Sequence, residues 1–102
     1  MFMKLIEMYE EIYHQSKAEG IKKFSMREVV INPDYIVTIR ADTILEKYLR
    51  DNPSFADGLQ KEQKFTRISL NKGNSGQEVV VIGSLESITK LFDIGIKKVI
   101  KG

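Results

Sequence analysis

The stretch MREVVINPDYIVTIRAD, residues 26–42, decides the fold of this chain. Two runs rich in Val and Ile, 27–31 and 35–40, flank the tripeptide Asn-Pro-Asp at 32–34. β-Branched side chains suit the pleated surface of a sheet, whereas Asn, Pro and Asp suit a compact turn. The stretch therefore predicts two central strands joined by a turn, to which the other strands pair, or one long strand with a bulge at Pro33.

The N-terminal segment fits two structures. Leu5, Met8 or Tyr9, and Ile12 recur at helical spacing, whereas Met3, Leu5 and Tyr9 alternate with polar positions as in a strand. Residues 9–25 are polar and predict a connection with one or two helical turns. The periodicity alone leaves both the helix and the strand open for residues 3–9.

A short helix is predicted near 43–51. Thr43 and Glu46 have the spacing of a capping box, in which each side chain satisfies a backbone N–H at the helix start. Pro53 ends the helix, and residues 53–64 predict a loop. The predicted apolar stripe of this helix is Ile44, Leu45, Tyr48 and Leu49.

The C-terminal half predicts a hairpin followed by a helix. Strands at 65–71 and 78–82 flank a glycine-containing turn at 72–76, and Ser84 caps the helix. An apolar stripe extends from Leu85 through Ile88 to Val99 unless Gly95 ends the helix early. The chain is thus predicted to be one α+β domain, residues 1–102. It has a small antiparallel sheet of four to five strands, a C-terminal amphipathic helix and the short helix near 43–51.

Three strand segments are apolar on both faces. Residues 29–31, 35–37 and 79–82 lack the alternation that an antiparallel sheet with one wet face should show. Something must therefore cover each face, and the predicted helices offer little area for it. This pattern predicts a homo-oligomer, with Val30, Val37 and Val80 as candidate interface residues.

Composition excludes several classes of protein. The chain has 102 residues, 42% of them hydrophobic, and it contains no cysteine, which excludes disulfides and thiolate chemistry. No apolar run approaches the roughly 20 residues that span a bilayer, and no secretory signal is visible. We expect a cytoplasmic protein without a membrane segment.

No motif for chemistry stands out. His14 is the single histidine, on a polar segment, and no metal or cofactor site is predicted. The Gly-x-x-Gly at 73–76 has the form of a nucleic-acid clamp, but the predicted strands on either side indicate a hairpin turn. Phosphate-binding and nucleophile motifs are lacking. We therefore expect that the protein is not an enzyme.

Charge is unevenly distributed. Net charge is +2, but residues 61–102 carry eight basic and four acidic side chains. A basic half suits either a solvated surface or nucleic-acid binding that weakens steeply with salt. The candidate residues for nucleic-acid binding are Lys61, Lys64, Arg67, Lys72, Lys97 and Lys98.

The order of the strands resembles FlbD-type proteins, which are short β-rich proteins of flagellar operons with relatives in bacteria and phages. The resemblance covers about half the chain, in the segments MKLIEMYE, REVVINPDYIVTI, FTRISLNKG and QEVVVIGSLESITKLF. It implies a strand at residues 3–9 and no catalytic residues. The matching positions are Val29, Ile31, Asn32, Asp34, Ile36 and Ile39.

Taken together, these features predict a non-enzymatic interaction or assembly module of bacterial or phage type. Its expected partner is a second copy of the chain, as in a homodimer, or another protein. The alternative is a nucleic-acid-binding regulator that uses the basic C-terminal half.

Overall fold

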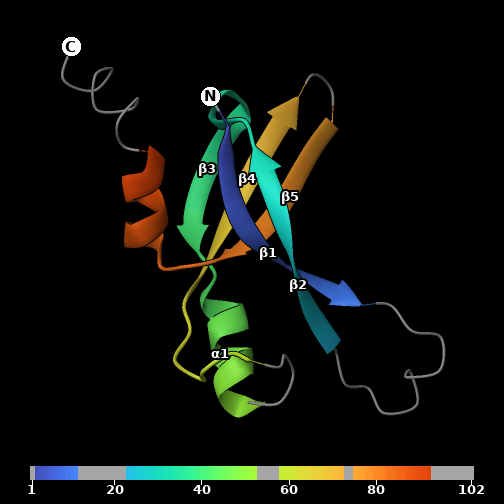
Figure 1. The fold of residues 1–102 in the computed structure, drawn as a ribbon, viewed down its shortest axis with the longest axis vertical. Helices are drawn as coiled ribbons and strands as arrows, with labels where there is room; N and C mark the ends of the chain where they lie inside the picture. The colour runs from blue at the N-terminus through green and yellow to red at the C-terminus, as the bar shows by residue number, and fades with distance from the viewer. Residues whose placement is uncertain (1, 12–22, 53–57, 73–74, 93–102) are drawn as a thin grey trace.

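The computed structural model describes residues 2–11, 23–52, 58–72 and 75–92. These residues form one antiparallel five-stranded sheet with two helices, which confirms the α+β prediction (Figure 1). The elements in chain order are β1 (Met3–Glu11), β2 (Lys23–Ile31), a 3-10 turn η2 (Pro33–Tyr35), β3 (Ile36–Ala41), α1 (Thr43–Asp51), β4 (Phe65–Lys72), β5 (Ser75–Ile82) and helical residues 85–92.

The strands lie in the order β2-β1-β5-β4-β3. The prediction that the two strands around Asn32 are central is therefore wrong, because β2 and β3 are the two edges of the sheet. Asn32 explains the difference: its side chain accepts the N–H of Asp34 at 3.0 Å and begins η2. A 3-10 turn carries the chain away from β2, whereas a hairpin turn would pair the flanking strands.

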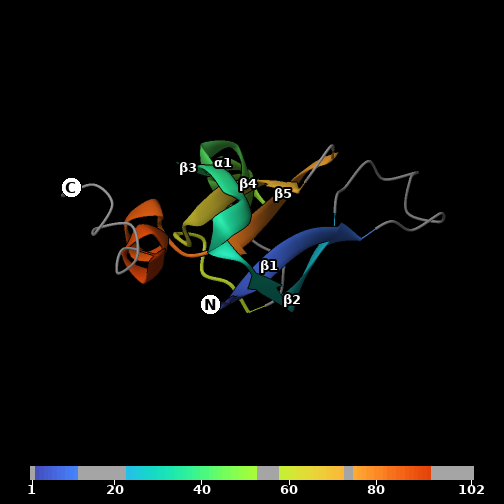
Figure 2. The ribbon, with the colours of Figure 1, turned by 90° about the horizontal axis from the view of Figure 1, so that it is seen from above.

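The short connection between the two edges forces the sheet to curl. The edges of a flat five-stranded sheet lie about 19 Å apart. The chain from Ile31 to Ile36 could span about 18 Å if fully extended, and η2 shortens it further. The β1–β2 hairpin consequently folds across β4 and β5, and the view from above separates the two parts (Figure 2).

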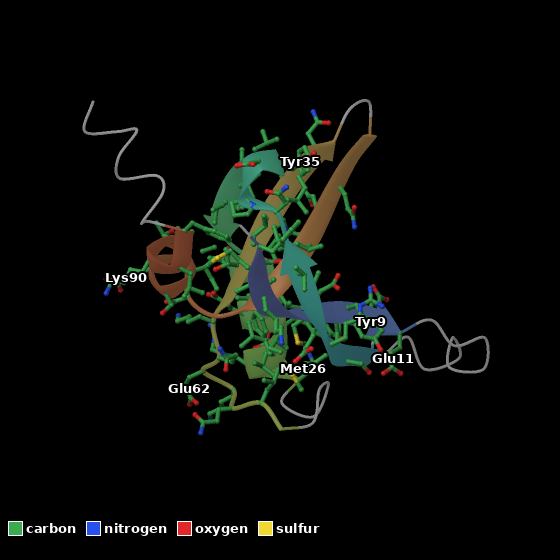
Figure 3. The ribbon with its side chains drawn as sticks, turned by 45° about the horizontal axis from the view of Figure 1, so that its top comes forward. Tyr9, Glu11, Met26, Tyr35, Glu62 and Lys90 are labelled. Carbon is green, nitrogen blue, oxygen red and sulfur yellow. The ribbon has the colours of Figure 1, made fainter. Side chains whose placement is uncertain are left out.

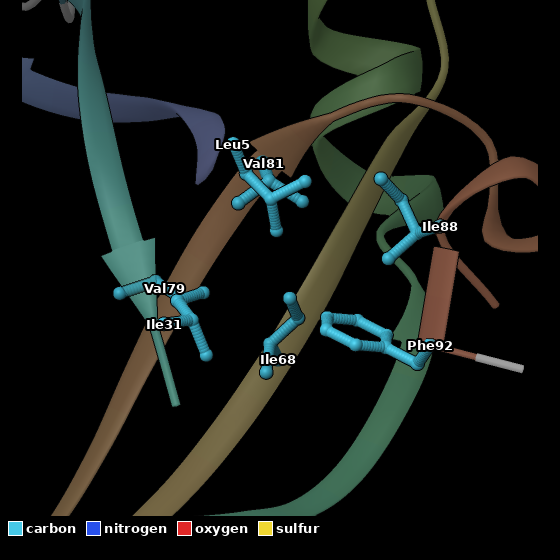
Figure 4. Close-up of a cluster of buried hydrophobic side chains, with 7 residues drawn as sticks. All are labelled: Leu5, Ile31, Ile68, Val79, Val81, Ile88 and Phe92. Atoms are coloured by element: carbon cyan, nitrogen blue, oxygen red, sulfur yellow. The ribbon is translucent and has the colours of Figure 1, made fainter. Parts of the chain in front are cut away.

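The inner face of the curled sheet holds the main core. Ile88 and Phe92, from helical residues 85–92, close this core against Ile68 (Figure 4). The N-cap of this helix is Ser84, as predicted, because its hydroxyl accepts the N–H of Ser87 at 3.1 Å. The buried members of the cluster are Leu5, Ile31, Ile68, Val79, Val81, Ile88 and Phe92.

The outer face is covered in part by α1. Leu45 and Leu49 of the helix pack with Met8 and Phe65, and Phe24 lies 6.4 Å from Tyr48 between ring centroids. The predicted helix bounds, 43–51, are confirmed. Ile44, however, is 82% exposed, so its assignment to the buried apolar stripe of the helix was wrong.

The predicted capping box at the start of α1 is also wrong. Asp42, not Thr43, is the N-cap, and its carboxylate accepts the N–H of Leu45 at 3.0 Å. The side chain of Glu46 turns away from the helix start and accepts the N–H of Phe65 at 3.0 Å. The start of the helix is thereby connected to the start of β4.

The open question at the N-terminus is settled in favour of a strand. β1 pairs with β2 over its whole length, from Met3 opposite Ile31 to Glu11 opposite Lys23. Alternation then places Met3 and Leu5 on the inner face with Ile31, and Ile6 and Met8 on the outer face. The connection predicted over 9–25 is wrong at its ends, because residues 9–11 and 23–25 belong to β1 and β2; its residues 12–22 and the apolar stripe beyond Phe92 lie outside the described residues.

Candidate interaction surface

The outer face of the β1–β2 hairpin has a covered end and an open end. Met8, at the covered end, is only 4% exposed because it packs under α1. Towards the open end, Ile6 is 39% and Val30 58% exposed. We name the four exposed apolar residues of this face the hairpin patch, which extends from the open end to Met26, opposite Met8: Phe2, Ile6, Met26 and Val30.

Strand register makes the hairpin patch continuous. Ile6 lies opposite Glu28, so its diagonal neighbours across the ladder are Met26 and Val30. Diagonal neighbours are about 7–8 Å apart between Cα atoms, within reach of long apolar side chains. Phe2 precedes Lys4 and Ile6 at the alternate positions of β1 and is 66% exposed. Single exposed apolar residues are common, but adjacent ones on one strand pair form a surface that can bind a partner.

Two charged side chains flank the hairpin patch. Lys4 lies opposite Val30, and Glu28 lies opposite Ile6. Both are exposed, and in the described part of the chain neither forms an ion pair. Their charges are therefore available to a partner that covers the hairpin patch.

The charges on the other face of the hairpin are already paired. Arg27 Nε donates to Glu7 Oε1 at 3.0 Å, and the guanidinium lies 4.1 Å from the centroid of the Tyr9 ring. Figure 3 shows Tyr9 and Met26 on the part of the hairpin that lies far from Tyr35. Among the described residues, Lys4 and Glu28 beside the hairpin patch thus have no ion-pair partner, whereas Glu7 and Arg27 on the opposite face are paired with each other.

A groove of about 240 Å³ lies between α1 and the outer face. Arg67 forms part of its wall and is held by two carboxylates: Nη2 donates to Asp42 Oδ2 and Nη1 to Glu78 Oε1, both at 2.8 Å. The groove is lined by Met8, Glu10, Phe24, Asp42, Ile44, Leu45, Tyr48, Arg67 and Val80. Arg67 already binds two carboxylates. It therefore stabilises the wall of the groove rather than binding an added anion.

The same contact changes the titration of Glu78. The hydrogen bond from Arg67 lowers the pKa of the Glu78 carboxyl, and partial burial opposes this effect. The positive charge of Arg67, a hydrogen bond with Ser69 and the charge of Arg40 lower the pKa further. Glu78 is therefore held in its ionised form.

The three predicted interface residues come from three different strands. Val30 is exposed within the hairpin patch on β2, whereas Val37 is 62% exposed on β3, at the other edge of the sheet. Val80 is half-buried, lines the groove and pairs with Met8 of β1. The sheet thus brings Val80 next to Met8 and places Val30 diagonally across the ladder from Ile6. Phe2, Ile6 and Met26 were not among the predicted interface residues, and the signal for their exposure is alternation with polar positions.

The structure describes the side chains of three of the six residues that were predicted to bind nucleic acid. Lys61 is exposed, Lys64 Nζ lies 3.8 Å from Glu46 Oε1, and Arg67 forms the two ion pairs described above. For Lys72 only the backbone is described, and Lys97 and Lys98 lie outside the described residues. Of the three predicted residues whose side chains are described, Lys64 and Arg67 thus have carboxylate partners.

A metal-binding cluster and a membrane-spanning helix are both lacking in residues 2–11, 23–52, 58–72 and 75–92. These ranges contain no group of three or more His, Asp or Glu side chains able to hold a metal ion. Neither helix formed by these residues has the length and apolar character needed to cross a membrane. No protein family, curated protein or solved structure matches this chain.

Proposed function

We propose that this protein is a non-enzymatic interaction module that assembles with a second copy of itself through the hairpin patch. The observation that supports the proposal is the open end of the outer face. Ile6, Met26 and Val30 form a continuous apolar surface there, next to the half that α1 covers. Burying this surface against a partner removes apolar area from water at a gain of about 25 cal/mol per Å². The proposal includes a bacterial or phage origin, as the resemblance to FlbD-type proteins implies, and a cytoplasmic location, as the composition predicts.

The hairpin patch is small compared with stable interfaces, which bury about 800 Å² on each partner. We therefore expect a reversible dimer rather than a permanent one. Light scattering coupled to size exclusion, from about 5 to about 500 µM, should show the mass rising from one chain towards two.

Val30→Asp tests the surface directly. A carboxylate in the middle of the hairpin patch should keep the mass at one chain over the whole range, because burying an unpaired charge is costly. The matched control is Val37→Asp, since Val37 is equally apolar and similarly exposed but lies on β3. A wild-type protein that stays monomeric at every concentration, or a Val30→Asp variant that dimerises normally, would overturn the proposal.

The alternative, a nucleic-acid-binding regulator, has less support. Lys64 and Arg67 both have carboxylate partners, so an incoming phosphate would have to replace an existing ion pair. The alternative is tested by measuring binding to single- and double-stranded DNA and RNA at about 50 mM salt. Binding that falls steeply with added salt would support it.

A further inference from the structure

We infer that the second copy binds with its own hairpin patch crossed over the first, so that Lys4 of each copy faces Glu28 of the other. This inference rests on the proposed function and specifies the partner and its orientation. It is drawn from four neighbouring positions on the outer face of the β1–β2 hairpin: Lys4, Ile6, Glu28 and Val30.

The four side chains occupy the corners of a parallelogram. Lys4 lies opposite Val30 and Ile6 lies opposite Glu28, with about 5 Å across the ladder and about 7 Å along each strand. The two apolar residues therefore share one diagonal, and the two charges share the other. The charges are of opposite sign, and both side chains are exposed.

A two-fold axis lying along the apolar diagonal makes this arrangement complementary to itself. Rotation about that axis places Ile6 against Ile6 and Val30 against Val30 of the second copy. The same rotation exchanges the two charged corners, so each Lys4 meets a Glu28 of the other copy. A dimer of two identical chains requires a self-complementary surface of this kind.

The geometry agrees with a known class of sheet packing. Because the diagonal of a rectangle of about 5 by 7 Å runs at about 35° to the strands, the rotation crosses the hairpins of the two copies at about 70°, which is closer to orthogonal than to aligned packing. The charges would lie at the rim of the contact. Rim charges fix the orientation of a complex and contribute little affinity, so they are sensitive to charge reversal.

The test uses two charge-reversed variants of the full chain, Lys4→Glu and Glu28→Lys. In a dimer of either variant alone, both corner contacts join like charges, and we expect self-association to weaken about tenfold or more. In a mixed dimer the corners are complementary again, since one chain presents carboxylates at both charged corners and the other presents ammonium groups at both. An equimolar mixture should therefore form a one-to-one heterodimer about as tightly as the wild-type protein self-associates.

Two further measurements strengthen the test. The double variant carrying both reversals should form a homodimer like the wild type, because each corner still joins opposite charges. Added salt should reduce the difference between the single variants and the wild type, because the contacts are exposed. Circular dichroism of each variant would verify that the sheet is retained.

Each outcome is decisive. Restored association in the mixture supports the crossed arrangement. Variants that dimerise normally, a loss in only one of them, or a mixture that stays monomeric would overturn it, even if Val30→Asp shows that the hairpin patch is the interface. A dimer that pairs the two β2 edges is distinguished as well, because Lys4 lies on β1, one strand away from that edge. A wild-type monomer at every concentration would remove the proposed function itself.

Discussion

Glu46 of α1 accepts a hydrogen bond from the backbone N–H of Phe65, the first residue of β4. The carboxylate is buried, and the donor belongs to a residue with no exposed surface. A single side chain thus connects the helix that covers the outer face to the strand at the centre of both hydrophobic clusters.

Replacing Glu46 with Ala should destabilise the fold. The N–H of Phe65 would lose its acceptor inside the protein, at a cost of about 1–3 kcal/mol in the free energy of unfolding. Glu46→Gln keeps an acceptor oxygen and should cost less. Urea unfolding measures both variants, with the exposed Glu62→Ala as the control. Equal losses for Ala and Gln would show that the charge, through Lys64, matters more than the hydrogen bond.

Gly83→Ala should be more harmful than Gly76→Ala. Gly83 has φ +132°, and a Cβ atom there would lie 2.9 Å from Cδ1 of the buried Ile88. We expect a loss of about 1–3 kcal/mol from backbone strain, in addition to the displacement of Ile88. At Gly76 the nearest atom would be 3.9 Å away and φ is not positive, so this substitution controls for the added methyl group. Similar thermal midpoints for the two variants would contradict the prediction.

The burial of α1 can be tested with two residues of the same helix. Leu49 has no exposed surface, whereas Ile44 is 82% exposed. Leu49→Ala should cost about 2–5 kcal/mol in the free energy of unfolding through lost contacts and a cavity. Ile44→Ala should stay within about 0.5 kcal/mol of the wild type. A large loss at Ile44 would mean that this side chain packs against a surface in solution.

The pKa of Glu78 makes stability depend on pH in the acid range. Because Arg67 lowers the pKa of Glu78 in the folded protein below its ordinary value of 4.5, the unfolded chain binds the proton more tightly. The ion pair therefore stabilises the fold above the unfolded pKa, and this contribution is lost as the pH falls through the folded pKa. Glu78→Gln should flatten the fall of the urea midpoint below about pH 4.5, with Glu62→Gln as the control for removing one negative charge. An unchanged slope would contradict the prediction.

Local signals in the sequence predicted the type of most elements, and long-range pairing explains what they missed. The turn residues and the apolar pattern located α1, β4 and β5, and Ser84 located the last helix. The same Val-Ile runs that indicate strands do not say which strands become neighbours. The hydrogen bond between Asn32 and Asp34 begins a 3-10 turn instead of a hairpin turn. β2 and β3 therefore do not pair with each other, and they form the two edges of the sheet instead of its centre.

Of the residues in the hairpin patch, the sequence singled out Val30 alone, because its strand is apolar on both faces. Its neighbours across the ladder are fixed by the register with β1. That register places Ile6 between Val30 and Met26, which lie four residues apart on β2. Asp42 was missed as a cap because Thr43 has an equally suitable side chain one position later. Asp42 also binds Arg67 of β4, a contact between distant segments that the local sequence does not reveal.

The ladder between β1 and β5 is the shortest in the described part of the sheet. Within the described residues, only Glu7 and Met8 are paired with β5, opposite Val81 and Val80, whereas β1 and β2 are paired along nine positions. The hairpin and the β3–β4–β5 meander are connected along the chain through η2, and they share both hydrophobic clusters. If the β1–β5 ladder and the contacts around it opened, the hairpin and the meander would each keep their internal ladders. Each would then expose a free strand edge. The hairpin of one molecule could then dock on the meander of another, so the topology that builds the curled sheet also provides a route to domain exchange.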